Sequence, residues 1–176
     1  MNTPDADTRR IGRRLGLLAT LAFLALGWVS FDGALERRED PNRNLVVAPG
    51  ASELVLQRNR AGHYLLPGEI NGRPVRLLLD TGATQVSVPA RLAAELGLQA
   101  GAPASVLTAN GAVTVRQTRI PRLAFGPFEF RDVAGHLNPG MQGDEVLLGM
   151  SALRHLEFTQ RGGTLTLRAP GSPGAS

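Results

Sequence analysis

The sequence predicts an all-β domain over residues 52–168, with a closed or barrel-like sheet and one or two short helices. Three observations support this fold class. From Leu54 onward, short apolar runs alternate with turn residues. Asn71-Gly72 separates two such runs, which is the strongest short-range signal for a β-hairpin. The 21 glycines and 12 prolines of the 176-residue chain favour short strands and turns over long helices.

Each expected strand is a short run of apolar, β-branched or aromatic residues that ends at turn residues. In chain order the expected strands are ELVLQ (53–57), HYLLPGEI (63–70), PVRLLLD (74–80), TQVSV (84–88), SVLT (105–108), VTVRQTRI (113–120), LAF (123–125), FEFRDVAGHL (128–137), EVLLG (145–149), LEFTQ (156–160) and TLTLR (164–168). Further hairpin turns are expected at 110–111, at 126–127 and at 161–163.

Two short helices are expected between these strands. The first covers PARLAAELGL, residues 89–98, because Pro89 suits the start of a helix and Gly97 suits its end. The second covers MSALRH, residues 150–155, and is one or two turns long.

The N-terminus predicts a membrane segment. Residues 1–14 contain four arginines, and residues 15–31, LGLLATLAFLALGWVSF, contain no charge. A helix of that length reaches roughly 25 Å, the short end of what spans a bilayer. The arginines on the near side predict that the N-terminus is cytoplasmic and the rest of the chain exported. A cleaved signal peptide is the alternative, although Ala25-Leu26-Gly27 only approximates a cleavage site.

Composition and charge indicate where the domain ends and exclude several classes of function. Residues 32–51 are expected to be a linker and residues 169–176 a disordered tail, since both lack a sustained apolar period. All 19 basic residues are arginines, but they are scattered and aromatic residues are only 5%, so no nucleic-acid surface is predicted. The absence of cysteine excludes disulfides, thiol catalysis and Cys-ligated metals.

The remaining histidine and serine patterns predict neither a metal site nor a serine hydrolase. His63, His136 and His155 lack the spacing of metal ligands, so neither a metal nor another cofactor is expected. Ser151 lies four residues before His155 on the expected second helix, but no Gly-x-Ser-x-Gly elbow surrounds it.

Asp80 is the candidate catalytic residue. It ends the apolar run VRLLL and is followed at once by Thr81 and Gly82. A carboxylate at the end of a buried strand is costly unless something pairs with it or uses it. Two carboxylates that share one proton can serve as acid and base in peptide hydrolysis, whereas a single one cannot. The structural alternative is that Asp80 caps a local turn.

Three segments carry a resemblance to a known family. VRLLLDTGATQVSVP, residues 75–89, resembles the active-site segment of aspartic proteases, and VLLGMSAL, residues 146–153, resembles the segment that packs behind their catalytic loop. TANGAVTV, residues 108–115, occupies the place of their flap hairpin. The match is closest to the single-lobe, retropepsin-like (clan AA) bacterial group, whose members carry an N-terminal membrane segment.

The resemblance implies a role for each matching residue. Asp80 would be catalytic, Thr81, Gly82 and Ala83 would form the active-site loop, and Leu148 and Gly149 would support that loop. The flap residues that would close over a peptide substrate are Ala109, Asn110 and Gly111.

The resemblance also implies partners and a location. A single lobe with one Asp-Thr-Gly motif would need Asp80 of a second chain, so the enzyme would be a homodimer. LEFTQRGGTLTLR, residues 156–168, is the candidate dimer segment. The domain would lie in the periplasm, held to the bacterial inner membrane by residues 15–31. Two alternatives stay open: a dimeric periplasmic binding or scaffold module without catalysis, and a protease that is inert until a partner brings two lobes together.

Overall fold

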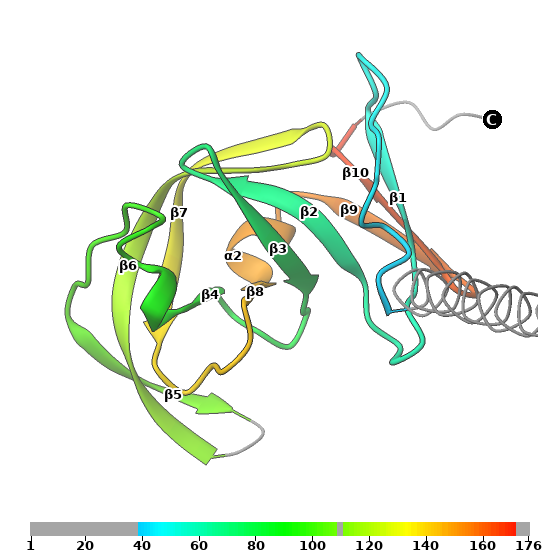
Figure 1. Cartoon of the computed structure of the whole chain (residues 1–176). Coiled ribbons are helices and arrows are strands. Elements are labelled where there is room, and N and C mark those ends of the chain that lie inside the picture. Colours follow the sequence, from blue (N-terminus) through cyan, green and yellow to red (C-terminus); the bar gives the residue numbers. More distant parts are fainter. Residues whose placement is uncertain (1–38, 109–110, 172–176) are drawn as a thin grey trace, which may run out of the picture. The chain divides into compact units, whose positions relative to one another are not determined.

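Ten strands make up most of the regular structure in residues 39–108 and 111–171, the part of the chain that the computed structural model describes (Figure 1). The strands are β1 (Glu53–Gln57), β2 (Leu65–Ile70), β3 (Arg73–Leu79), β4 (Val86–Pro89), β5 (Pro103–Thr108), β6 (Gly111–Phe125), β7 (Phe128–Asn138), β8 (Glu145–Leu148), β9 (Glu157–Arg161) and β10 (Thr164–Arg168). One 3₁₀ helix, η1 (Ala90–Leu92), and one α-helix, α2 (Met150–Leu153), complete the described elements.

Six of the strands form a closed barrel, which confirms the predicted fold class. The sheet runs β2-β3-β8-β4-β7-β6-β5, and β2 also pairs with β6 through Glu69↔Ala124 and Ile70↔Leu123. That pairing closes the barrel and leaves β5 outside it, where β5 and β6 extend as a hairpin (Figure 1). The core is apolar and fully buried at positions such as Leu77.

The hairpin turns follow the sequence prediction at two of three two-residue sites. Ile70 pairs with Arg73, so Asn71 and Gly72 form the turn, and both have positive φ, 52° and 78°. The 126–127 turn is likewise closed by a pair between the residues on either side. At the third site Thr108 pairs with Gly111, which places Gly111 in β6 and not in the expected turn 110–111.

The helix expected over residues 89–98 is wrong. The structure has the 3₁₀ helix η1 followed by turns to Gly97. Leu98 N–H donates to Ala93 O at 2.8 Å and Gly97 has φ 65°. This is the geometry of a helix C-terminus, and it follows only a few residues after η1. The Asn71 side chain also donates to Leu96 O at 2.8 Å, so a contact from the turn between β2 and β3 holds the end of this segment.

The folded unit begins at Glu39, earlier than the expected domain start at residue 52. Asp40 and Asn42, expected in the linker 32–51, are 5% and 3% exposed. Asp40 forms an ion pair with Arg76 of β3. The Asn42 amide donates to Gln57 O and Leu65 O and accepts from Gln57 N–H, each at 2.8 Å. This segment therefore joins β1 to β2.

Replacing Asn42 by alanine is expected to lower the free energy of unfolding by about 2–3 kcal/mol, because backbone groups of Gln57 and Leu65 lose their partners. Denaturant unfolding of the two proteins measures the difference. Asn44→Ala is the matched control, since Asn44 is exposed two residues away. Equal losses in the two variants would contradict a specific role for Asn42.

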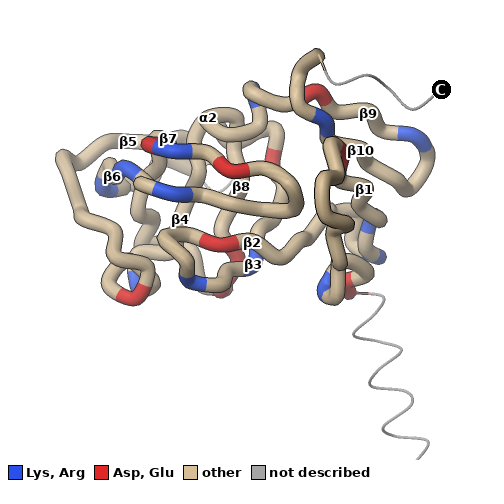
Figure 2. Tube along the Cα trace, turned by 90° about the horizontal axis from the view of Figure 1, so that it is seen from above, with Lys and Arg blue, Asp and Glu red and all other residues tan. Residues whose placement is uncertain are grey.

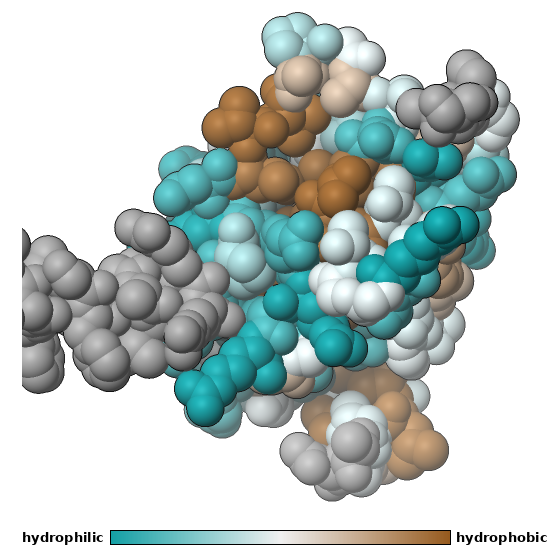
Figure 3. All heavy atoms as spheres, turned by 90° about the vertical axis from the view of Figure 1, so that its right-hand side faces the viewer, coloured by the Kyte–Doolittle hydropathy of each residue, from teal (hydrophilic) through white to brown (hydrophobic). Residues whose placement is uncertain are grey.

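A second sheet, β1-β10-β9, joins the N-terminal strand of the domain to its C-terminal hairpin. The hairpin 156–168 was expected, but its pairing with β1 was not. Leu165 and Leu167 of β10 are buried, whereas all five residues of the edge strand β9 are exposed. Figure 3 looks onto the side where Figure 1 places this sheet, and hydrophobic side chains gather there among polar ones.

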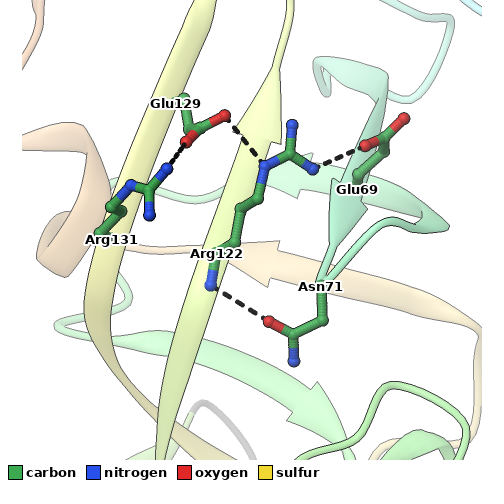
Figure 4. Close-up of polar contacts among 5 residues, drawn as sticks. All are labelled: Glu69, Asn71, Arg122, Glu129 and Arg131. Atoms are coloured by element: carbon green, nitrogen blue, oxygen red, sulfur yellow. Dashed lines mark hydrogen bonds and ion pairs between the residues drawn. The ribbon is translucent and has the colours of Figure 1, made fainter.

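An ion-pair network crosses the seam where the barrel closes. Arg122 of β6 bonds Glu69 of β2 and Glu129 of β7, each at 2.9 Å, and Arg131 bonds Glu129 at 3.0 Å (Figure 4). Arg122 N–H also donates to the Asn71 side chain. Elsewhere acidic and basic positions are mixed along the described trace (Figure 2). The network supplements the short backbone pairing of β2 with β6.

The hydrogen bond from Arg122 lowers the pKa of Glu129 below its usual value. The positive charges of Arg122 and Arg131 lower it in the same direction. A carboxylate whose pKa is lower in the folded than in the unfolded state stabilises the protein at pH values above the unfolded-state pKa. That stabilisation is lost as the pH falls through the folded-state pKa. Glu129→Gln is therefore expected to be less stable at neutral pH and to show a shallower loss of Tm below about pH 4.5. Glu95→Gln, at an exposed position, should follow the wild-type Tm profile.

No helix within 39–108 and 111–171 is long and apolar enough to cross a membrane. The predicted segment 15–31 lies outside these described residues, as do the basic segment 1–14 and residues 172–176 of the expected tail.

Candidate active site

Asp80 follows directly on β3, at the point where β3 leaves the barrel sheet. β3 runs parallel to β8 with Leu78↔Leu147 and Leu79↔Leu148 as partners. The backbone N–H of Asp80 continues this pairing and donates to Leu148 O at 3.1 Å. The sheet therefore fixes the Asp80 backbone up to the residue that carries the carboxylate, and the side chain is half-buried.

The loop after Asp80 orients the carboxylate through one backbone N–H. Gly82 N–H donates to Asp80 Oδ1 at 2.9 Å, and Ala83 N–H donates to Asp80 O at 3.3 Å. The loop thus turns back on Asp80 and orients one carboxylate oxygen by a backbone donor. The Thr81 side chain is exposed and makes no hydrogen bond with any described residue.

Leu148 and Gly149 lie behind this loop. Leu148 is fully buried, and Gly149 is followed by α2, whose first two N–H groups donate to Ala83 O at 2.8 Å and Thr84 O at 3.0 Å. A Cβ on Gly149 would lie 2.3 Å from Gln85 O and 2.7 Å from Ala83 O. The close approach requires glycine, so the residues resembling the supporting segment do contact the loop.

Ser151 is a supporting residue that sequence reasoning missed. Its hydroxyl donates to Ala134 O of β7 at 2.7 Å and accepts from Val86 N–H of β4 at 3.0 Å. One side chain therefore joins α2 to two strands of the barrel just after the loop. Its position two residues after Gly149 could have indicated this role. From the sequence alone, Ser151 is considered only as a candidate nucleophile near His155.

Asp80 opens into a cleft of about 820 Å³. Its walls come from the loop after β3, from β4, β7 and β8, and from the β5–β6 hairpin. The lining side chains are mostly small or polar, and Asp80 is the one carboxylate that lines the cleft in the described part of the chain. Of the expected flap residues, Gly111 begins β6, while Ala109 and Asn110 lie outside the described residues.

His136 of β7 also lines the cleft, which the sequence did not predict. Its side chain is half-buried, and burial lowers its pKa below 6.5. The other histidines lie elsewhere: His63 is exposed, and the His155 ring stacks near Phe130 at a centroid distance of 6.1 Å. No group of acidic or histidine side chains in 39–108 and 111–171 could hold a metal ion.

Comparisons with known proteins agree with this geometry. The family model described as gag-polyprotein putative aspartyl protease matches residues 66–155. The crystal structure of a retropepsin-like aspartic protease from Rickettsia conorii superposes with a TM-score of 0.57 and 29% sequence identity, covering 66% of this chain and 90% of that one.

Two curated relatives are uncharacterized proteins. One, from the cobV 5′ region of a Sinorhizobium species, is 29% identical over 169 residues, which cover 86% of this chain and 71% of the relative. The other, from Rickettsia prowazekii, is 28% identical over 108 residues, 60% of this chain and 46% of the relative.

Proposed function

This chain belongs to the gag-polyprotein putative aspartyl protease family, and we propose that it is a homodimeric aspartic endopeptidase that hydrolyses peptide bonds. Asp80 of each copy would contribute one carboxylate to the catalytic dyad. The observation that carries the proposal is the single carboxylate of the cleft, presented on a loop that the barrel holds by its backbone. One such residue is half of an acid–base pair.

The proposed mechanism uses the two Asp80 carboxylates as acid and base. The ionised carboxylate accepts a proton from a water as that water attacks the scissile carbonyl carbon. The protonated carboxylate donates its proton to the carbonyl oxygen, which gives a tetrahedral diol. As the C–N bond breaks, the first carboxyl passes the proton it took from water to the leaving nitrogen, and the second carboxylate takes back a hydroxyl proton, so the dyad returns to its starting state. Gly82 N–H, already bonded to Asp80 Oδ1, would keep each carboxylate oriented through these steps.

The three-stranded sheet supports the proposal of a dimer. Its edge strand β9 exposes all five residues, and Phe158 in that strand is 46% exposed. An exposed edge strand offers unpaired backbone groups to another chain. A two-fold pairing of these sheets is the proposed contact.

The proposed location is the bacterial inner membrane, with the folded unit in the periplasm. Support comes from the sequence alone: residues 15–31 carry no charge, and the arginines precede them. The lipid bilayer is then a partner of the chain through that segment.

Peptide cleavage at a series of protein concentrations tests the proposal. The full chain in detergent should turn over a peptide library with a rate that rises faster than linearly with concentration, because two copies complete each site. Turnover should vanish in Asp80→Asn. Equal residual rates in the two proteins would remove Asp80 from the chemistry. No cleavage by either protein would leave two alternatives: a dimeric binding or scaffold module with the same fold, or a protease that needs a partner to bring two lobes together.

A further inference from the structure

A row of four side chains crosses the floor of the cleft on neighbouring strands. Ser87 of β4 is the register partner of both Leu147 of β8 and His136 of β7, and His136 is also the partner of Gln117 of β6. All four residues line the cleft that contains Asp80. Directly paired residues on neighbouring strands share a face of the sheet, so these side chains form one continuous surface.

Two members of the row are unpaired donors. Within the described residues, neither the His136 ring nor the Gln117 side chain makes a hydrogen bond. Ser87 differs, because its hydroxyl donates to Met141 Sδ at 3.2 Å and keeps only acceptor capacity toward the cleft. The His136 ring is half-buried and the Gln117 side chain is exposed, and a polar group without a protein partner is costly once a ligand excludes water from it.

We propose that His136 and Gln117 form a polar subsite that takes a substrate side chain ending in a carboxylate or an amide. The inference rests on the proposed peptidase function and specifies its substrate class. An amide or carboxylate oxygen can accept from both the His136 N–H and the Gln117 amide. A large apolar side chain would leave both donors buried and unpaired, so the subsite discriminates against it.

The charge of the subsite changes with pH. Burial lowers the pKa of His136 from its ordinary value, so the ring is neutral at pH 7 and gains its charge as the pH falls. The two strands that pair with β7 bring no other charge to the cleft, since β4 supplies Ser87 and β6 supplies Gln117. The next strand of the sheet, β8, supplies Leu147. Asp80 is the other titratable group facing the cleft in the described part of the chain. The preference for glutamate over glutamine should therefore grow as pH falls below about 6.5.

Matched peptides test the subsite with the full-length protein. Each set places Glu, Gln or Leu in turn at the positions flanking the scissile bond. Wild type should cleave the Glu and Gln peptides about tenfold better than the Leu peptide at one position, the effect of one good hydrogen bond. His136→Leu should remove this preference. His136→Gln should retain it but lose the rise toward acid pH.

His63→Leu is the matched control, because it removes an exposed histidine outside the cleft and should leave the profile unchanged. Equal cleavage of all three peptides by wild type, or an unchanged profile in His136→Leu, would overturn the subsite.

A binding measurement separates this inference from the proposed function. Peptides with a reduced, uncleavable amide at the scissile position, differing only by Glu or Leu, are titrated into wild type and His136→Leu by calorimetry. Tighter binding of the Glu peptide by wild type alone supports the subsite even if no peptide is cleaved, in which case only the peptidase activity fails. Equal binding of the two peptides by wild type overturns the subsite whatever the cleavage result.

Discussion

Asp80→Asn is expected to reduce peptide hydrolysis by about three orders of magnitude while the fold and the dimer persist. Asparagine is nearly isosteric with aspartate and its side-chain oxygen can still accept from Gly82 N–H, so the loop keeps its geometry. What it loses is the carboxylate proton chemistry on both halves of the proposed dyad at once. Initial rates on a peptide library, with circular dichroism and sedimentation as checks, measure this outcome.

Asp132→Asn provides the matched control for this substitution. Asp132 is exposed, pairs with Arg119 at 3.2 Å and has φ 52°, a conformation that asparagine tolerates well. Its rates should stay within about twofold of wild type, as expected of a surface change away from the cleft. Loss of activity in both variants would indicate that removing any acidic charge disturbs the protein, and Asp80 would have no special role.

Gly149→Ala is expected to lower the free energy of unfolding by about 3 kcal/mol, because its Cβ would overlap the carbonyl oxygens of Gln85 and Ala83. Both oxygens belong to backbone, so relief requires movement of the loop that holds Asp80. Activity should fall together with stability, and more than stability alone explains when rates are compared well below the Tm. Thermal unfolding and initial rates at one low temperature separate the two effects.

Gly163→Ala is the matched control, since nothing lies within 4 Å of a Cβ at that position. It should keep wild-type stability, which is the property it controls, because Gly163 lies in the proposed dimer segment 156–168. A Gly149→Ala protein with wild-type Tm would show that the loop yields freely, and the supporting role assigned to this glycine would be wrong.

The parts of the fold that sequence predicted are those fixed by neighbouring residues. The Asn71-Gly72 turn needs two adjacent residues with positive φ, and that requirement is visible in the sequence itself. The apolar run before Asp80 and the glycine at 149 likewise mark the loop and its support through local composition. Each of these features is determined within a few positions of the chain.

The features that sequence did not predict depend on contacts between distant residues. Asn42 looks like a linker residue until its bonds to Gln57 and Leu65 are known. His136 enters the cleft only because the register pairs it with Ser87 and Gln117. The expected helix over 89–98 also differs from the structure. Its composition suits a helix, but the chain forms one 3₁₀ turn followed by turns, and Leu96 O accepts a hydrogen bond from the distant Asn71 side chain.

Because Asp40 and Asn42 are buried in the folded unit, the linker between that unit and the proposed membrane span is short. If residues 15–31 span a bilayer as proposed, seven residues, 32–38, separate the span from Glu39, and seven residues reach at most about 25 Å. Under that proposal each domain would stay close to the bilayer surface. Encounters between copies would then depend on the number of copies per area of membrane. Crowding within the membrane would govern how often two half-sites meet, so the cell could set activity by local density without any change to the cleft.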